Sequence, residues 1–273
     1  MKNALIIFTI TTFVSCNPED KQIKKEKYFY KPVIVQTKSK DSVLLFTKNC
    51  INDIFPMIAG KYKFSDTIIF TKNKTLNRPN RNDYFDDRLV GQTDSTLPDG
   101  LEILPDYHSS IAFNRYEEKN ASCYFPVYII NETPNKKALL GKDGYVFGLQ
   151  EALDKSGYWR PIEGRGFDFC GHGYFGLKIY PNEFVIILFP KYNGDYKTKI
   201  RVRIKNADNI YISQPFEGYI NENQLYLDKE GSFYKELVEN KASAIEYLFY
   251  GAKPYGTDDK NFGGMHATYR FGR

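Results

Sequence analysis

A strict alternation of side chains over residues 196–205 is the feature that most constrains the fold of this chain. The segment reads Tyr-Lys-Thr-Lys-Ile-Arg-Val-Arg-Ile-Lys, so every second position carries a cation and the positions between carry an apolar, aromatic or threonine side chain. Successive side chains of a β-strand point to opposite faces, so this period of two predicts a strand with one buried and one hydrated face.

Neighbouring segments carry further strand and turn signals. Residues 123–131 are apolar at both parities, as in a strand buried on both faces, although Pro126 favours an edge or a bulge. Residues 154–157 read Asp-Lys-Ser-Gly, which is typical of a type I turn and predicts a hairpin around it. Pro181 and Asn182 predict a second tight turn between two apolar segments.

The whole chain is predicted to be mainly β. Its 22 Tyr and 21 Phe favour pleated, half-buried surfaces, and short strands recur between turns over residues 100–228. This spacing favours an antiparallel β-sandwich, immunoglobulin-like or jelly-roll-like. A stripe of apolar residues at helical spacing over residues 232–250, with Ser232 as N-cap and Gly251 just beyond the end, predicts a C-terminal amphipathic helix.

The N-terminus has the order of a bacterial export signal. Lys2 precedes an apolar run over residues 4–13, which is too short to cross a bilayer, and small Ser15 precedes Cys16. Residues 13–16, Phe-Val-Ser-Cys, resemble the lipoprotein box, in which the cysteine is lipidated and becomes the new N-terminus. The alternative is an ordinary secretory signal cleaved elsewhere. Glu19 and Asp20 are similar to the surface-export signal of Bacteroidota lipoproteins.

These features predict the domain boundaries of the chain and its cellular location. Residues 1–15 are predicted to be a signal peptide, 16–99 a tether and N-terminal extension with a long polar loop, 100–228 the β-sandwich, and 229–273 the helix and a tail. The resemblance implies a lipid-anchored protein of the bacterial outer membrane, either periplasmic or surface-exposed. The lysine-rich start of residues 16–31 is interpreted as a solvated tether, with attraction to anionic headgroups as the alternative.

A second resemblance covers residues 124–225. The segments 148–153 (Gly-Leu-Gln-Glu-Ala-Leu), 159–163 (Trp-Arg-Pro-Ile-Glu) and 189–194 (Phe-Pro-Lys-Tyr-Asn-Gly) are similar to a group of uncharacterised Bacteroidota lipoproteins. The resemblance implies no activity and no catalytic residues. Trp159, Arg160 and Glu163 are interpreted as a packing cluster, with a ligand-binding aromatic beside a charge pair as the alternative.

Three cysteines remain once Cys16 is assigned to the lipid. An exported chain sits in a compartment that permits disulfides, and an odd number allows at most one internal bridge. Cys123 and Cys170 are the preferred pair because both lie in the β-rich region.

Two groups of side chains are candidate sites. The cationic face of residues 196–205 is either a solvated sheet face or a surface for an anionic glycan; its members are Lys197, Lys199, Arg201, Arg203 and Lys205. Asp168, Cys170 and His172 alternate onto one face of an extended segment and supply a carboxylate, a thiol and an imidazole. They form a weak candidate for a metal site or a reactive thiol, and the glycines around them favour a loop instead.

The sequence favours a non-enzymatic binding or structural role. It contains no nucleophile elbow, zinc-protease motif or phosphate-binding loop. No cofactor, resident metal or nucleic-acid partner is expected; the expected partners are the membrane, through the lipid, and an envelope protein or anionic glycan. The alternative is an envelope hydrolase or metal-dependent enzyme that uses Asp168, Cys170 and His172.

Overall fold

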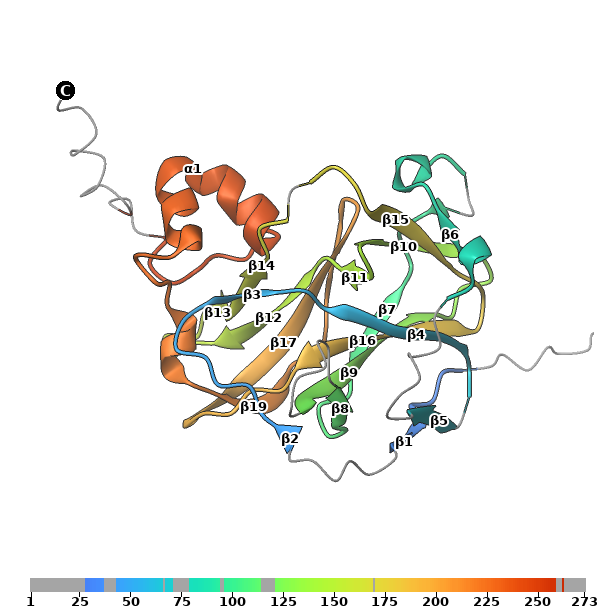
Figure 1. The fold of residues 1–273 in the computed structure, drawn as a ribbon, viewed down its shortest axis with the longest axis horizontal. Helices are drawn as coiled ribbons and strands as arrows, with labels where there is room; N and C mark the ends of the chain where they lie inside the picture. The colour runs from blue at the N-terminus through green and yellow to red at the C-terminus, as the bar shows by residue number, and fades with distance from the viewer. Residues whose placement is uncertain are drawn as a thin grey trace, which may run out of the picture.

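The computed structural model describes residues 28–36, 43–65, 67–70, 79–93, 96–113, 121–168, 170–258 and 262. Within these residues the protein is mainly β with a C-terminal helix, which confirms the predicted fold class (Figure 1). The predicted signal peptide and Cys16 lie outside the described residues.

The larger sheet has ten strands. They are β2 (Val43–Leu44), β4 (Met57–Lys63), β6 (Tyr84–Phe85), β7 (Glu102–Pro105), β8 (Ile111–Phe113), β9 (Ala121–Asn131), β10 (Lys137–Lys142), β11 (Tyr145–Val146), β15 (Tyr174–Ile179) and β16 (Glu183–Pro190). The order is β2-β9-β16-β4-β11-β10-β15-β6, and β7 and β8 also pair with β9. Every pair is antiparallel except β2 with β9.

The second sheet has five antiparallel strands. They are β12 (Gly148–Leu153), β13 (Trp159–Pro161), β17 (Tyr196–Asn206), β18 (Asn209–Ile212) and β19 (Phe216–Ile220). The predicted alternation is confirmed in β17, where Ile200, Val202 and Ile204 are buried and the residues between them are partly exposed. The predicted hairpin is confirmed as β12–β13, closed by a hydrogen bond from Gly157 N to Asp154 O at 3.0 Å.

Two short parallel ribbons and several helices complete the fold. The ribbons pair β1 (Val33–Gln36) with β5 (Thr67–Phe70), and β3 (Asn52–Ile54) with β14 (Glu163–Arg165). The helical elements whose residues are all described are the 3-10 turns η1 (Arg81–Asp83), η2 (Asp87–Leu89) and η4 (Glu222–Leu225) and the α-helix α1 (Ser232–Phe249).

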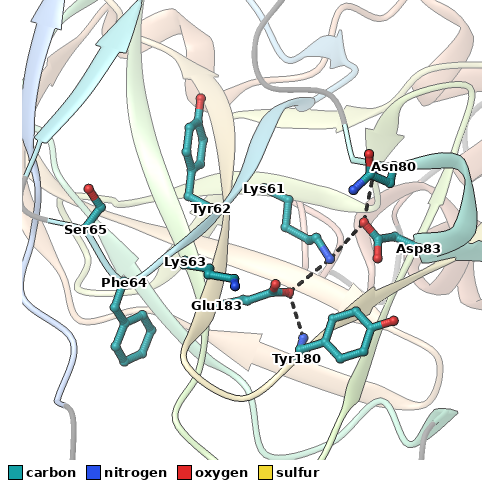
Figure 2. Close-up of a pocket in the computed structure, with 9 residues that line it drawn as sticks. All are labelled: Lys61, Tyr62, Lys63, Phe64, Ser65, Asn80, Asp83, Tyr180 and Glu183. Atoms are coloured by element: carbon teal, nitrogen blue, oxygen red, sulfur yellow. Dashed lines mark hydrogen bonds and ion pairs between the residues drawn. The ribbon is translucent and has the colours of Figure 1, made fainter.

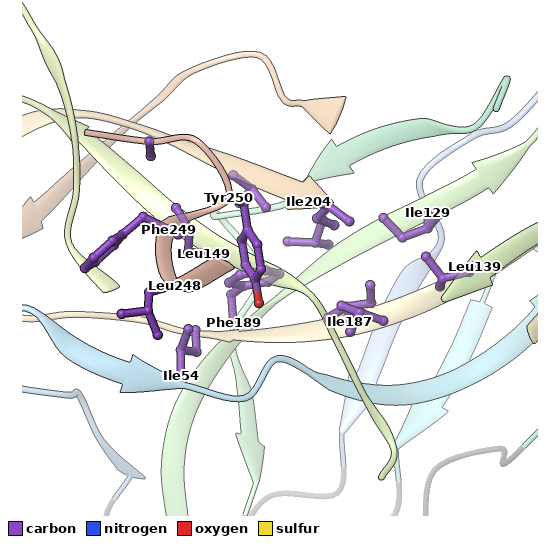
Figure 3. Packing of buried hydrophobic residues seen from close by; sticks show 14 of the residues in the cluster. Ile54, Ile129, Leu139, Leu149, Ile187, Phe189, Ile204, Leu248, Phe249 and Tyr250 are labelled. Carbon is purple, nitrogen blue, oxygen red and sulfur yellow. The ribbon is translucent and has the colours of Figure 1, made fainter. Parts of the chain in front are cut away.

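One hydrophobic core joins the two main sheets and the helix. Ile129 and Ile187 reach it from the larger sheet, Leu149 and Ile204 from the smaller, and Leu248 from α1 (Figure 3). All are at most 1% exposed, so the sheets and helix bury a shared apolar interface. This sandwich-like packing fixes the positions of the strand faces that line the sites below.

The N-terminal region contributes more to the fold than its predicted role suggests. Strand β4 lies inside the larger sheet between β16 and β11, and its Ala59 is fully buried. The division proposed at residue 99 therefore cuts a continuous sheet. Strand β4 lacks an alternating pattern because the adjacent Ala59 and Gly60 at its centre are both buried.

Two local expectations differ from the structure. Pro126 lies within β9 rather than at a sheet edge, opposite Leu188 of β16, and its carbonyl accepts a hydrogen bond from Asp106 N at 2.9 Å. Asn182 makes the predicted tight turn at φ 59°, but β15 and β16 pair with other strands and not with each other.

Helix α1 lies where the spacing predicts it, but its ends and its regularity differ from the expectation. Its N-cap is Gly231 and not Ser232, and Tyr250 takes the left-handed conformation at φ 51° one residue before the predicted Gly251. Asn240 has non-helical angles and divides the helix. Leu237, Leu248 and Phe249 are buried at the helical spacing that the sequence predicts, and Phe233 and Ala244 are buried beside them.

Candidate functional site

A cleft of about 520 Å³ brings together side chains from the five-stranded sheet and the segment that follows α1. Its lining residues are Glu151, Tyr158, Trp159, Arg160, Arg201, Arg203, Gly251, Ala252, Lys253 and Asp258. Four of these side chains are cationic and two are carboxylates, so the lining has an excess of positive charge. The cleft also contains the only tryptophan of the chain.

Strand register explains how the cleft residues meet. Arg201 of β17 lies directly opposite Glu151 of β12, and Trp159 of β13 lies opposite Leu153 on the other side of β12. Arg201 and Arg203 are two residues apart and therefore share the face opposite the buried Val202. The hairpin turn at residues 154–157 then brings β13 back beside this face.

A single carboxylate holds both arginines of β17. Glu151 accepts hydrogen bonds from Arg201 Nε at 2.8 Å and Arg201 Nη2 at 3.2 Å. It also accepts one from Arg203 Nη2 at 3.3 Å, and Arg203 Nη1 donates to Tyr250 O at 3.2 Å. Because two guanidinium groups share one buried carboxylate, one positive charge at this point remains uncompensated by Glu151.

The aromatic wall of the cleft contacts Arg201 and Arg160. The Arg201 guanidinium lies over the Trp159 ring, 4.3 Å from its centroid, and Arg160 lies 5.1 Å from the Tyr158 ring centroid. Such cation–π contacts orient both groups without consuming all of the guanidinium donors. Tyr158 is 61% exposed, so its ring is open to solvent at the rim.

Arg160 connects the sheet to the segment after the helix. Its Nε donates to Asp154 at 3.1 Å, and its Nη1 donates to Asp258 at 2.7 Å and to Lys253 O at 3.3 Å. The hydrogen bond from Arg160 lowers the pKa of the Asp258 carboxyl. Arg160 thus fixes the wall formed by residues 251–258 against β13.

The predicted cationic face is only partly available as a continuous surface. Lys197 forms an ion pair with Glu217 at 2.9 Å, and Arg201 and Arg203 turn toward Glu151. Lys199 is exposed and Lys205 is partly buried. The five cations therefore do not form one uniform patch; two of them instead join Trp159 and Arg160 in the cleft.

Asp168, Cys170 and His172 do not form the candidate metal site. The Asp168 carboxylate is paired with the buried Lys142 and accepts a hydrogen bond from Tyr145 OH at 3.3 Å. Cys170 and His172 are both exposed. Among the described residues, no group of three His, Cys, Asp or Glu side chains is arranged to hold a metal ion.

The predicted Cys123–Cys170 disulfide is also wrong in this structure, where both cysteines are free. Cys123 is buried in β9 opposite Ala112 of β8, whereas Cys170 is exposed in the connection between β14 and β15. Both positions lie in the β-rich region, but in segments that do not pair with each other.

A second pocket, of about 510 Å³, contains a compensated charge cluster (Figure 2). Lys61 of β4 lies between Asp83 and Glu183, with its Nζ 3.0 Å from a carboxylate oxygen of each. Glu183 also accepts a hydrogen bond from Tyr180 N, and Asp83 accepts one from Asn80 N. These contacts join β4, β16 and η1, which indicates a structural role.

Sequence reasoning missed two residues that organise these sites. Glu151 is buried within β12. A buried carboxylate is rarely found without a partner, so its place in an apolar segment predicts a cation beside it. Asp258 follows α1 in a segment interpreted as a tail, where the sequence offers no comparable signal. Only the fold brings it to Arg160, nearly a hundred residues earlier.

None of the helices formed by the described residues combines the length and apolarity that a membrane crossing requires. Comparisons of the chain with protein-family models, with curated proteins and with solved structures find no match.

Proposed function

We propose that this chain is a lipid-anchored protein of the bacterial outer-membrane envelope that binds an acidic glycan in the Trp159 cleft and does no chemistry on it. The observation that carries the proposal is the meeting of Trp159 with Arg160, Arg201 and Arg203 around one cleft. The anchor itself rests on the sequence of residues 1–16, where Cys16 ends a lipoprotein box.

The chemistry of the lining suits an acidic sugar. Arginine donates two parallel hydrogen bonds to a carboxylate or sulfate, and the excess of cations over carboxylates attracts such a group. The exposed Tyr158 and the Trp159 ring offer flat apolar faces on which a sugar ring can pack. The cleft volume, about 520 Å³, accommodates a small oligosaccharide.

The enzymatic alternative receives no support from the described residues. Asp168 is committed to Lys142 and Tyr145, and Cys170 and His172 are exposed without a third metal-ligating partner among those residues.

Fluorescence titration tests the binding proposal directly because Trp159 is the only tryptophan. A uronic-acid oligosaccharide is expected to change the emission in a saturable way, and higher salt is expected to weaken the affinity. The neutral oligosaccharide of the same length is the matched control. Equal affinity for both, or no saturable change with either, would contradict the proposal.

Two substitutions distinguish binding in the cleft from nonspecific attraction to surface cations. Arg201→Gln removes a cleft cation and is expected to weaken binding about tenfold or more, since a charge-assisted hydrogen bond contributes roughly 1.5–3 kcal/mol. Lys199→Gln removes an exposed cation of the same strand that does not line the cleft, and is expected to leave the affinity unchanged. Equal losses from both variants would indicate nonspecific attraction.

The anchor has its own test. Cys16→Ala is expected to abolish incorporation of labelled fatty acid and to move the protein out of the membrane fraction. Retention of the label would place the acyl group elsewhere, and an unlabelled wild-type chain would favour an ordinary secretory signal.

A further inference from the structure

The β1–β5 ribbon presents an unusual outer face. Its parallel register places Val33 beside Thr67 and Val35 beside Ile69. Val33 is 63% exposed and Ile69 is 68% exposed, although both sit in regular strands. Side chains of a ribbon alternate, so these residues form one apolar face directed away from the body.

The inner face of the same ribbon is fixed to the protein. Ile68 and Phe70 are buried in a core cluster with Tyr128 and Phe184, and Ile34 packs against it. The Gln36 side chain donates to Ala112 O and accepts from Ala112 N, which ties β1 to β8. The outer face is therefore held in place rather than free to turn inward.

Two tyrosines precede the ribbon. Tyr30 is 75% exposed and Tyr28 is also exposed, while Phe29 between them packs into the core below. Tyrosine rings with one apolar and one polar end are typical of the boundary between lipid and water. Lys31 follows them at the same end of the ribbon, with an exposed side chain whose Nζ pairs with Asp106 at 3.2 Å.

We propose that this outer face, formed by Tyr28, Tyr30, Val33, Val35 and Ile69, lies against the lipid bilayer that holds the acyl anchor. The inference rests on the proposed anchor at Cys16. Twelve residue steps separate Cys16 from Tyr28, which limits the distance between them to about 40 Å. Four lysines and three acidic residues lie between the two positions, and the lysines cluster on the side nearer Tyr28.

The arrangement of elements agrees with such an orientation. In Figure 1, β1 and β5 lie at the lower right, β2 lies at the lower edge, α1 lies at the upper left and β13 lies at the left. Strand β2 adds exposed Val43 and Leu44. A molecule resting on the β1–β5 ribbon would hold β13, the strand of Trp159, away from the bilayer surface. An apolar face this small binds lipid weakly by itself, but an anchor holds it at high local concentration.

Photolabelling in a membrane tests the proposal. The processed protein, purified from the membrane fraction, is reconstituted in vesicles of phosphatidylethanolamine and phosphatidylglycerol containing a lipid-soluble photoreactive probe. Peptides covering residues 28–36 and 67–70 are expected to carry several times more label than the peptide covering residues 209–212. That peptide contains Ile210 and Ile212, which are exposed isoleucines of a strand in the other sheet and serve as the internal control.

Paired variants sharpen the result. Val33→Glu combined with Ile69→Glu is expected to lower ribbon labelling several-fold, whereas Ile210→Glu combined with Ile212→Glu is expected to leave it unchanged. An unchanged thermal midpoint shows that both variants fold. A protein that is acylated at Cys16 but labelled equally on the ribbon and on β18 would overturn the membrane contact and leave the anchor standing.

Other outcomes separate the two proposals further. Labelling of the ribbon in an unacylated protein added to vesicles would support the contact and overturn the anchor. An unacylated protein without ribbon labelling would overturn both. A dimer in sedimentation that dissociates in the Val33→Glu, Ile69→Glu variant would assign the face to a second copy of the chain and overturn the membrane contact.

Discussion

At the scale of single residues, Glu163 is the most unusual ionisable group outside the cleft. It is fully buried at the start of β14, yet it accepts hydrogen bonds from Gln150 N at 2.7 Å, Gln150 Nε2 at 2.9 Å and Tyr192 OH at 2.5 Å. Burial raises the pKa of Glu163 to about 7, although these three donors oppose the shift. The contacts that Glu163 makes between β12, β14 and the segment after β16 therefore depend on pH.

This coupling predicts a fall in stability as pH rises. Because the folded-state pKa lies above the ordinary value of 4.5, the protonated form favours folding; its contribution is complete below pH 4.5 and is lost as pH rises through 7. The free energy of unfolding is expected to fall by about 3 kcal/mol between pH 4.5 and pH 8 from this group alone. Urea unfolding at a series of pH values measures it.

The matched variants for this prediction are Glu163→Gln and Glu217→Gln. The first is expected to flatten the pH dependence between pH 5 and 8 because it removes the titrating group. The second removes an exposed carboxylate and is expected to retain the dependence. A wild-type profile that rises over this range, or one that Glu163→Gln leaves intact, would contradict the assignment.

At the scale of elements, the Lys61 cluster connects strands that are distant in the chain. Lys61 of β4 compensates Glu183 of β16 and Asp83 of η1, and all three side chains are largely buried (Figure 2). Lys61→Met leaves two carboxylates facing each other with no cation between them. The expected loss is about 3 kcal/mol of unfolding free energy, measured in urea.

Two further variants identify the origin of that loss. Lys63→Met changes an exposed lysine of the same strand and is expected to stay within about 0.5 kcal/mol of the wild type. Glu183→Gln added to Lys61→Met is expected to recover part of the loss, since it removes one of the two unpaired charges. No recovery would mean that the packing of the lysine stem, rather than its charge, stabilises the cluster.

The helix and the strands also show which structural features the sequence predicts and which it does not. The alternation of β17 gave its location and its buried face correctly, because a period of two is unambiguous over ten residues. The helix and the burial of Leu237, Leu248 and Phe249 follow from the apolar spacing, but the break at Asn240 does not. Strand β4 escaped recognition because adjacent positions, Ala59 and Gly60, are both buried and its polar residues do not alternate with apolar ones.

The candidate site was less predictable than the strands. Trp159 with Arg160, and Arg201 with Arg203, were each recognised in the sequence, but as separate features. Their meeting depends on the β13-β12-β17 order, and Asp258 joins them only through the docking of the segment after α1. Asp168, Cys170 and His172 are close in sequence but do not form a site. They lie in the connection between β14 and β15 and not in a strand, where alternate side chains would share a face.

At the scale of the whole molecule, the core predicts that the N-terminal strands are required for folding. A chain of residues 100–273 corresponds to the predicted sandwich and helix, but it lacks β4, which fills the position between β16 and β11. It is expected to show no cooperative thermal transition by circular dichroism, whereas the full chain shows one. A truncated chain that melts at the midpoint of the full chain would restore the boundary at residue 99.

The wall formed by residues 251–258 has a consequence for how the cleft behaves. These residues follow α1 directly and reach the sheet through Arg160 and Arg203, which bond to Asp258, Lys253 O and Tyr250 O. A ligand that requires this wall binds only the state in which the helix is docked. By thermodynamic linkage, occupation of the cleft must then slow amide exchange and proteolysis in α1, and any change that lowers the docked fraction must lower the apparent affinity in proportion to that fraction.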